Sequence, residues 1–227
     1  MNWILNFLKS SLGKKIIMSL TGLFLCLFLV IHLLGNLQLL KQDGGKAFNI
    51  YAYVMTHNPI IKIISWINYF FILFHAIQGL VLYFQNKSAR KFDYDKKHNS
   101  KTSFGARNMA ILGTLILAFI LIHMGDFWLK MKREVLVWVN YEGYDHVQDL
   151  YSRVSIAYDQ WWIVLFYVFS IGVLYYHLSH GFQSAFQTLG INHPRYTPII
   201  KGFGKWYSIL ICLGFAIIPI IHFFFYK

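Results

Sequence analysis

The sequence predicts an all-α membrane protein with five transmembrane helices. Of its 227 residues, 57% are hydrophobic and only 13% are charged, whereas an ordinary soluble domain has about 25% charged residues. So few charges do not cover a water-facing surface, which excludes a soluble enzyme. Each of five apolar runs is long enough to cross a hydrocarbon layer of about 30 Å. These runs cover about residues 16–40, 60–84, 108–129, 161–186 and 206–225.

The connections between the runs carry the turn and charge signals. Within Lys41–Pro59, Gly44-Gly45 predicts a turn, and His57-Asn58-Pro59 predicts the end of one helix and the start of the next. The connection 86–106 is polar and rich in Lys, and the connection 130–160 holds most of the acidic residues. No linker is long enough for a second domain and no short repeat is visible, so we expect a single transmembrane domain over residues 1–227.

Lys and Arg are distributed unevenly between the two sides of the membrane. With a cytoplasmic N-terminus, the inner stretches are 1–15, 86–107 and 187–205, and they hold 13 of the 21 basic residues. The positive-inside rule therefore predicts a cytoplasmic N-terminus and an outer C-terminus. The inner face would carry nearly all of the net charge of +12. Since no basic run is interleaved with aromatic residues, we expect membrane lipid or an acidic protein as its partner and no nucleic acid.

Histidines are the main titratable residues inside the apolar runs. Such groups are costly in a bilayer and mark functional sites by default. At about 1.5 Å of rise per residue, His32 and His123 lie near the outer ends of the first and third helices. By the same count, His75 and His177 lie nearer the inner ends of the second and fourth helices. Alternate helices lie diagonally across a four-helix bundle, so we expect two histidine pairs with room for a planar ligand.

Four glycines repeat this pairing. Gly22 and Gly113 each precede the histidine of their helix by ten residues, which places them near the depth of the inner pair. Gly79 and Gly181 each follow a histidine by four residues. Because glycine removes side-chain volume, a bulky group can approach the backbone at these four positions.

The histidine pairs suggest two stacked haems. Neutral imidazole is a usual ligand of haem iron, so His32 and His123 would hold an outer haem, and His75 and His177 an inner haem. Cys26 and Cys212 form no haem-attachment motif, which favours b-type haem. With both axial positions filled, the iron has no site for oxygen, and electron transfer becomes the expected role.

The fourth helix offers a second candidate for the inner ligand. His180 lies three residues after His177, on nearly the same helix face, so it could replace His177 or bind a haem propionate. The four-residue spacing of His177 and Gly181 matches that of His75 and Gly79, and this favours His177. His222, near the C-terminus, is expected to be an interfacial residue.

Other classes of site find less support. A transporter or proton channel could use intramembrane histidines as a relay. Such a protein would need carboxylates at the midplane and broken helices, and the sequence indicates neither. The sequence contains no HExxH zinc motif, GxSxG motif, phosphate-binding loop or dinucleotide-binding glycine fingerprint.

In the order and spacing of its motifs, the chain resembles the dihaem cytochrome b membrane anchor of succinate:quinone oxidoreductases, in the form with one large five-helix subunit. The resemblance covers about residues 10–225. The matching segments are Ser19–Leu25 leading to His32-Leu33-Leu34, Phe74–Gly79, Arg107-Asn108 with His123, and His177–Gly181 followed by Gln187–Gly190. In the corresponding pattern of relatives the first histidine is the ligand, which again favours His177.

The resemblance implies a role as one subunit of a succinate dehydrogenase or fumarate reductase. A flavoprotein subunit and an iron–sulfur subunit would dock on the cytoplasmic face of a bacterial inner membrane. Electrons would reach quinone, most often menaquinone in this five-helix form. The alternative is the dihaem anchor of another respiratory complex, such as a formate dehydrogenase or hydrogenase.

Depth along the helices also gives candidates for the remaining contacts. Ser19, Arg107 and His180 lie near the inner haem and are candidates to bind its propionates. The residues at the level of the outer haem that could bind quinone are Gln38, Asp43, His57, Asn58 and Asp126.

Overall fold

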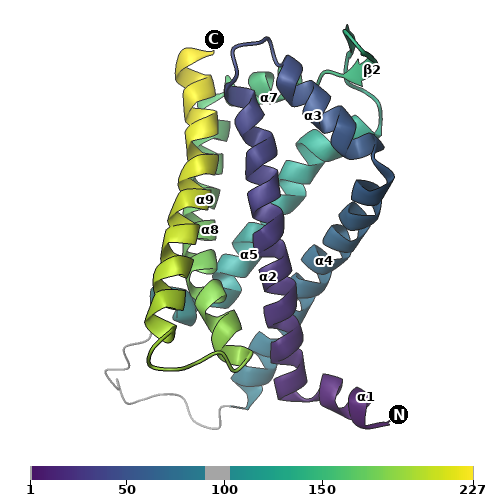
Figure 1. Ribbon diagram of the computed structural model, residues 1–227. Coiled ribbons are helices and arrows are strands. Elements are labelled where there is room, and N and C mark those ends of the chain that lie inside the picture. Colours follow the sequence, from purple (N-terminus) through teal and green to yellow (C-terminus); the bar gives the residue numbers. More distant parts are fainter. Residues whose placement is uncertain (1, 90–102, 227) are drawn as a thin grey trace.

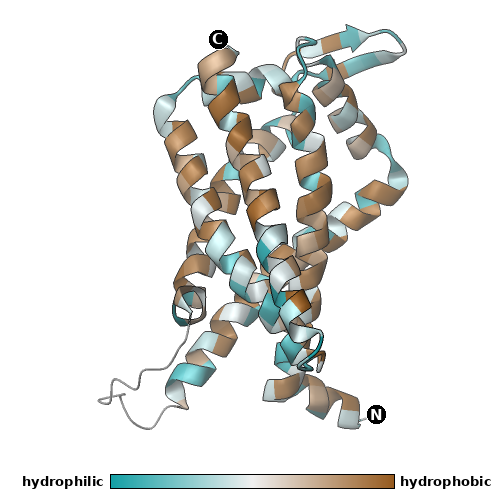
Figure 2. Cartoon of the chain, turned by 60° about the vertical axis from the view of Figure 1, so that its left-hand side comes forward, coloured by the Kyte–Doolittle hydropathy of each residue, from teal (hydrophilic) through white to brown (hydrophobic). Residues whose placement is uncertain are grey.

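Five long helices form the protein, as the sequence predicts. The computed structural model describes residues 2–89 and 103–226. Within these residues, five helical segments are long and apolar enough to cross a membrane. They are Ser11–Leu40, Pro59–Ser88, Phe104–Lys132, Trp161–Thr188 and Thr197–Phe225. The chain is therefore a multi-pass membrane protein in which hydrophobic residues cover the lengths of the helices and hydrophilic residues gather at their ends (Figure 2).

The first two long helices each begin at a residue whose side chain accepts from free backbone N–H groups. A short helix, α1 (Asn2–Lys9), turns sharply into α2 (Ser11–Asn36), where the Ser10 hydroxyl accepts a hydrogen bond from the Gly13 N–H. Asn58 caps α4 (Pro59–Ser88) by accepting from the Ile60 and Ile61 N–H groups. The stop and start predicted at residues 57–59 is confirmed, because α3 (Lys46–His57) ends where this cap begins.

The third membrane segment changes helix type after its histidine. Helix α5 (Phe104–His123) continues as a five-residue π-helix, η2 (Met124–Trp128), and then as α6 (Leu129–Lys132). A π-helical turn of this kind often occurs at a functional site. Helices α8 (Trp161–Thr188) and α9 (Thr197–Phe225) complete the set. The fifth helix begins nine residues before the predicted start, at the polar sequence around Lys201.

Four of the helices form a ring in which α2 and α5 lie diagonally opposite each other. Helix α2 packs against α4 and α8, and α5 packs against the same two helices. Helix α9 lies outside this ring against α8 and α2 (Figure 1). The diagonal placement of alternate helices is therefore as predicted. The two termini lie at opposite ends of the bundle (Figure 1), which we call the N-terminal end and the C-terminal end.

A cap of short elements covers the C-terminal end of the bundle. It comprises the 3₁₀ helix η1 (Leu37–Leu40), α3, the antiparallel strands β1 (Trp138–Tyr141) and β2 (Tyr144–Gln148), and α7 (Leu150–Tyr158). Strand residues Trp138 and Tyr141 pair with Gln148 and Tyr144, with a bulge between Val139 and Tyr141.

Asn49 holds three parts of this cap together. It is completely buried, and its amide donates to the Tyr141 hydroxyl at 3.0 Å and to Asp149 at 2.9 Å. Its carbonyl oxygen accepts from the Tyr151 N–H at 2.9 Å. Helix α3, the hairpin and α7 are therefore joined through one side chain.

The cap is also joined to the last helix. His222 is buried, with Nε2 lying 3.2 Å from the Leu39 carbonyl oxygen, and Tyr226 donates to the Leu40 carbonyl at 2.6 Å. His222 was expected at the interface and is instead buried, because η1 and α7 cover this end of α9. Next to it, burial raises the pKa of the Tyr158 phenol, which remains a neutral packing group.

Candidate haem-binding site

Two pairs of histidines meet across the diagonals of the helix ring. The ring centroids of His32 on α2 and His123 on α5 lie 5.8 Å apart. Those of His75 on α4 and His177 on α8 lie 6.4 Å apart. The structure thus brings together the pairs that the sequence predicted, one toward the C-terminal end and one toward the N-terminal end.

The spacing within each pair fits two axial ligands of one metal. With a metal–nitrogen distance of about 2 Å and a ring radius of about 1 Å, two imidazoles on opposite sides of a metal have centroids ~6 Å apart. Among the described residues, no three His, Cys, Asp or Glu side chains form a metal-binding group. The four histidines form two pairs, and two ligands per pair match the two axial positions of haem iron.

Hydrogen bonds leave Nε2 free on one histidine of each pair. The Nδ1 of His75 lies 3.0 Å from the Thr21 hydroxyl oxygen, and the Nδ1 of His123 lies 3.1 Å from the Tyr167 hydroxyl oxygen. A metal-binding histidine usually engages its second nitrogen in this way, which fixes the ring orientation. Sequence reasoning did not assign a role to Thr21 or Tyr167, since a hydroxyl in an apolar run has no distinctive spacing.

The four histidines are only partly buried. All four keep an intermediate exposure although they face one another across the ring. Of the thirty residues in α4, Asn68 alone is buried, whereas α8 buries eight. This loose packing around α4 fits a site for a large planar group.

The four glycines predicted to make room lie beside the inner pair and beside two methionines. A Cβ at Gly22 would lie 3.1 Å from Cε1 of His75, and one at Gly113 would lie 3.6 Å from Cε1 of His177. Gly22 and Gly113 are thus at the depth that the spacing predicted. Gly79 and Gly181 face the methyl groups of Met18 and Met109, at 3.2 and 4.0 Å. Their role in packing against haem remains a prediction.

The propionate candidates lie on three helices toward the N-terminal end. Ser19 is buried and donates to the Lys15 carbonyl of its own helix, and Arg107 is exposed on the first turn of α5. The Nε2 of His180 lies 3.1 Å from the Ser184 hydroxyl oxygen of its own helix. The meeting of His75 with His177 supports His177 as the ligand.

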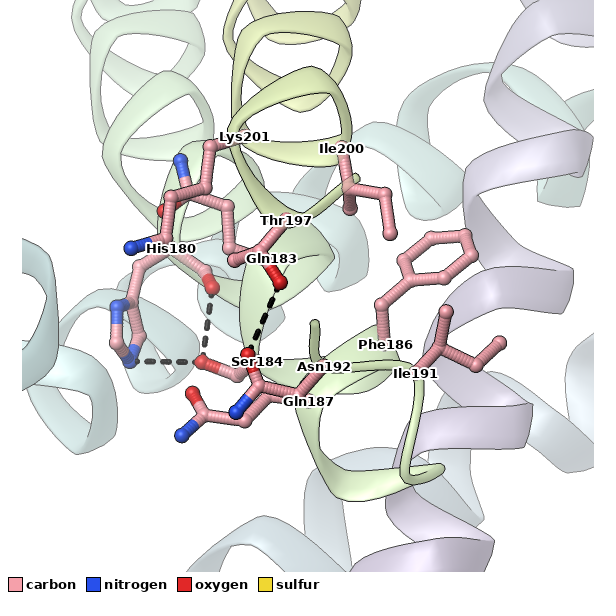
Figure 3. Close-up of a pocket in the computed structure, with 10 residues that line it drawn as sticks. All are labelled: His180, Gln183, Ser184, Phe186, Gln187, Ile191, Asn192, Thr197, Ile200 and Lys201. Carbon is pink, nitrogen blue, oxygen red and sulfur yellow. Dashed lines mark hydrogen bonds between the residues drawn. The ribbon is translucent and has the colours of Figure 1, made fainter. Parts of the chain in front are cut away.

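His180 lines a polar pocket of about 340 Å³ between the last turns of α8 and the first turns of α9. Figure 3 shows its imidazole and Ser184 on one side, with Lys201 of α9 nearby. The other polar lining residues are Gln183, Gln187, Asn192 and Thr197. The described residues that line this pocket include no carboxylate, so its chemistry suits an anionic group.

Most of the quinone candidates already have structural partners. Asp43 accepts from the Gly45 and Ala47 N–H groups, and Asn58 caps α4. Gln38 donates to the Leu34 carbonyl of the preceding turn, and Asp126 forms ion pairs with Lys130 and Arg153.

His57 is the candidate that lines a pocket. Its ring stacks on Tyr53 with centroids 4.0 Å apart. The pocket, of about 200 Å³, lies between α3 and the hairpin. A quinone role remains a prediction for all five candidates.

Several basic residues that entered the orientation argument lie outside the described residues. They are Arg90, Lys91, Lys96, Lys97 and Lys101. The remaining basic side chains of the N-terminal end include seven exposed ones, Lys9, Lys15, Lys87, Arg107, Arg195, Lys201 and Lys205.

Comparison with protein-family models, with curated proteins and with solved structures gives no match for this chain. A function is therefore inferred from the residues and their geometry.

Proposed function

We propose that this chain is a dihaem cytochrome b that forms the membrane anchor of a succinate:quinone oxidoreductase. The observation that carries the proposal is the meeting of His32 with His123 and of His75 with His177, at two levels of one helix ring. Isolated histidines in a membrane bundle more often serve as helix–helix hydrogen-bonding residues. Two diagonal pairs with metal-like spacing are better explained as ligands.

The protein residues would act by holding and orienting the groups. Each pair would bind one b-type haem through Nε2, and haem iron ligated on both faces supplies one-electron chemistry without an open site for oxygen. Thr21 and Tyr167 keep His75 and His123 oriented. The chain would thereby pass electrons between an iron–sulfur subunit and quinone, with menaquinone as the expected species.

We further propose that the N-terminal end faces the cytoplasm of a bacterial cell and binds the iron–sulfur subunit beside a flavoprotein. The exposed basic side chains at this end support docking of an acidic protein surface. The chain would supply the haem and quinone part of the enzyme, and the succinate site would belong to the flavoprotein.

A reduced-minus-oxidised spectrum with haem quantification tests the central proposal. We expect two low-spin b haems per purified chain, and a chain that binds one haem or none would contradict the paired-ligand assignment. In addition, His177→Ala should lose one haem and His180→Ala should keep both. The reverse result would exchange the ligand assignment of these two residues.

Copurification tests the assignment to a particular complex. A tagged chain expressed from its own host should bring down a flavoprotein and an iron–sulfur protein, and succinate should reduce its haems. Reduction by formate or hydrogen in place of succinate would instead assign the chain to the alternative respiratory complexes.

A further inference from the structure

The four-helix ring contains an internal repeat that is visible once the contacts are known. Helices α2 and α5 carry the same residue types at the same spacing, and so do α4 and α8. The equivalent pairs are Met18 and Met109, Gly22 and Gly113, Phe28 and Phe119, His32 and His123 on the first pair of helices, and His75 and His177, Gly79 and Gly181, Gln85 and Gln187 on the second.

The contacts repeat together with the residues. Gly22 faces His75 just as Gly113 faces His177, and Gly79 faces Met18 just as Gly181 faces Met109. Equivalent phenylalanines stack on equivalent histidines, with centroids 5.3 Å apart for Phe28 and His32 and 5.6 Å apart for Phe119 and His123. The helix pair α2–α4 is therefore related to α5–α8 by an approximate two-fold axis along the bundle. The two histidines of each pair occupy equivalent positions.

This symmetry is broken at the second ring nitrogen of the inner pair. His75 Nδ1 lies 3.0 Å from the Thr21 hydroxyl oxygen, but the position equivalent to Thr21 is Leu112. Within residues 2–89 and 103–226, the buried Nδ1 of His177 has no hydrogen-bond partner. Among the described residues, one imidazole of this pair thus has a hydrogen-bond partner at Nδ1 and its equivalent has none.

The outer pair is asymmetric in the same way. His123 Nδ1 lies 3.1 Å from the Tyr167 hydroxyl oxygen, and the position equivalent to Tyr167 is Ser65, whose hydroxyl donates to the Ile61 carbonyl. Next to His32, the Asn36 side-chain nitrogen lies 3.5 Å from Nδ1. An amide nitrogen donates and does not accept, so it gives no support to a protonated Nδ1.

Local hydrogen bonds decide which His75 nitrogen carries the proton. The Thr21 hydroxyl oxygen also lies 3.0 Å from the Ile17 carbonyl oxygen and 3.1 Å from that of Met18. Carbonyls only accept, so a Thr21 hydroxyl that donates to one of them leaves its oxygen to accept from His75 Nδ1–H, and His75 also has a backbone hydrogen bond with Met18. The His75 Nε2 lone pair is then free for a metal.

We propose that Thr21 and Tyr167 are positioning residues, each of which fixes one axial histidine of a different haem and lowers the reduction potential of that haem. An acceptor on Nδ1–H makes the imidazole a more basic ligand, and a more basic ligand favours the oxidised metal. This inference rests on the proposed function.

Redox titration of the purified chain tests the role of Thr21. Thr21→Val preserves shape and removes the hydroxyl. We expect it to keep two haems and to shift the reduction equilibrium of one haem up to tenfold toward the reduced form, which is 59 mV for a one-electron couple. Thr21→Ser, which keeps the hydroxyl, should titrate as the unmodified chain does.

Thr114→Val is the matched control. The Thr114 hydroxyl donates to the carbonyl four residues earlier, as in Thr21, but this side chain is exposed on the outside of α5. It should leave both potentials unchanged. An equal shift in Thr21→Val and Thr114→Val, or no shift in Thr21→Val, would overturn the role of Thr21.

Tyr167→Phe should shift the reduction potential of the other haem and leave that of the first unchanged. Tyr176→Phe, at an exposed position on the same helix, is its control. If Thr21→Val and Tyr167→Phe shift the reduction potential of the same haem, the proposal is overturned. If Thr21→Val loses one haem while Thr21→Ser keeps both, the haem content itself supports the positioning role of the Thr21 hydroxyl. If the unmodified chain binds no haem, it is the proposed function that fails.

Discussion

Gly22 of α2 packs against the imidazole of His75 of α4, because a Cβ at Gly22 would lie only 3.1 Å from Cε1 of the ring. A valine side chain there would displace His75 from its partner His177. We expect Gly22→Val to reduce the haem content from two per chain to one, as measured by quantification of extracted haem.

Gly172→Val on α8 makes the same change where no described residue lies within 4 Å of the added Cβ. The cost in helix propensity is the same in both variants, but Gly172→Val should keep both haems because its side chain displaces no histidine. Equal haem loss in the two variants would show that Gly22 has no special relation to His75.

Replacing Asn49 should destabilise the cap more than most other substitutions in it. Replacing it with Ala removes three hydrogen bonds and leaves the Tyr151 N–H at the start of α7 without its acceptor, while Asp149 keeps its hydrogen bonds from Ser152. Each unsatisfied buried group costs about 1–3 kcal/mol, so we expect unfolding in detergent to become easier by roughly 3 kcal/mol. Tyr141→Phe removes one of these bonds and should cost about 1 kcal/mol. If the two variants are equally stable, Asn49 does not join the cap.

Replacing either of the two adjacent glycines before α3 with alanine should lower the stability, but by different amounts. Both have positive φ angles, +64° for Gly44 and +85° for Gly45, which cost an L-residue about 1–2 kcal/mol. A Cβ at Gly45 would also overlap the Tyr151 ring, whereas no described residue lies within 4 Å of a Cβ at Gly44. In thermal unfolding, Gly45→Ala should therefore lose at least twice the stability that Gly44→Ala loses. Equal losses would mean that Tyr151 moves aside freely.

The membrane-spanning part of the fold follows from sequence because its signals are local. Apolar length determines the five spans, and residue spacing at a fixed helical rise determines the depth of each histidine. This is sufficient to predict that His32 meets His123 and that His75 meets His177. The Asn58-Pro59 cap is equally local.

The cap at the C-terminal end was not predicted, since it depends on contacts between distant segments. Asn49 is an ordinary polar residue in the sequence, and its partners lie about a hundred positions later. The same holds for Thr21 and Tyr167, whose relation to a histidine exists only after two helices pack. Asp43 and Asn58 were considered for quinone binding by depth alone, and their actual partners are backbone N–H groups nearby.

Thiol labelling tests the predicted orientation. The native Cys26 and Cys212 lie within membrane spans, so Lys9→Cys and Glu142→Cys introduce reporters at the two ends of the bundle. In intact cells, a membrane-impermeant maleimide should label Glu142→Cys at once and Lys9→Cys only after permeabilisation. The opposite pattern would place the N-terminus outside, and the unmodified chain serves as the background control.

Asp126 is expected to stabilise the protein through its two ion pairs. Its carboxylate accepts from Lys130 at 2.7 Å and from Arg153, which links η2 to α7. The Arg153 side chain is 20% exposed and that of Lys130 is 39% exposed, so the Arg153 pair is less screened by solvent. In detergent unfolding, Arg153→Met should therefore destabilise the chain more than Lys130→Met.

Asp126→Asn should cost about 1–2 kcal/mol, because it removes the charge that faces both cations. In the assembled complex, the KM for quinone should stay the same if the residue acts only through these pairs. A raised KM in a variant of unchanged stability would instead place Asp126 at the quinone, next to the His123 end of the bundle.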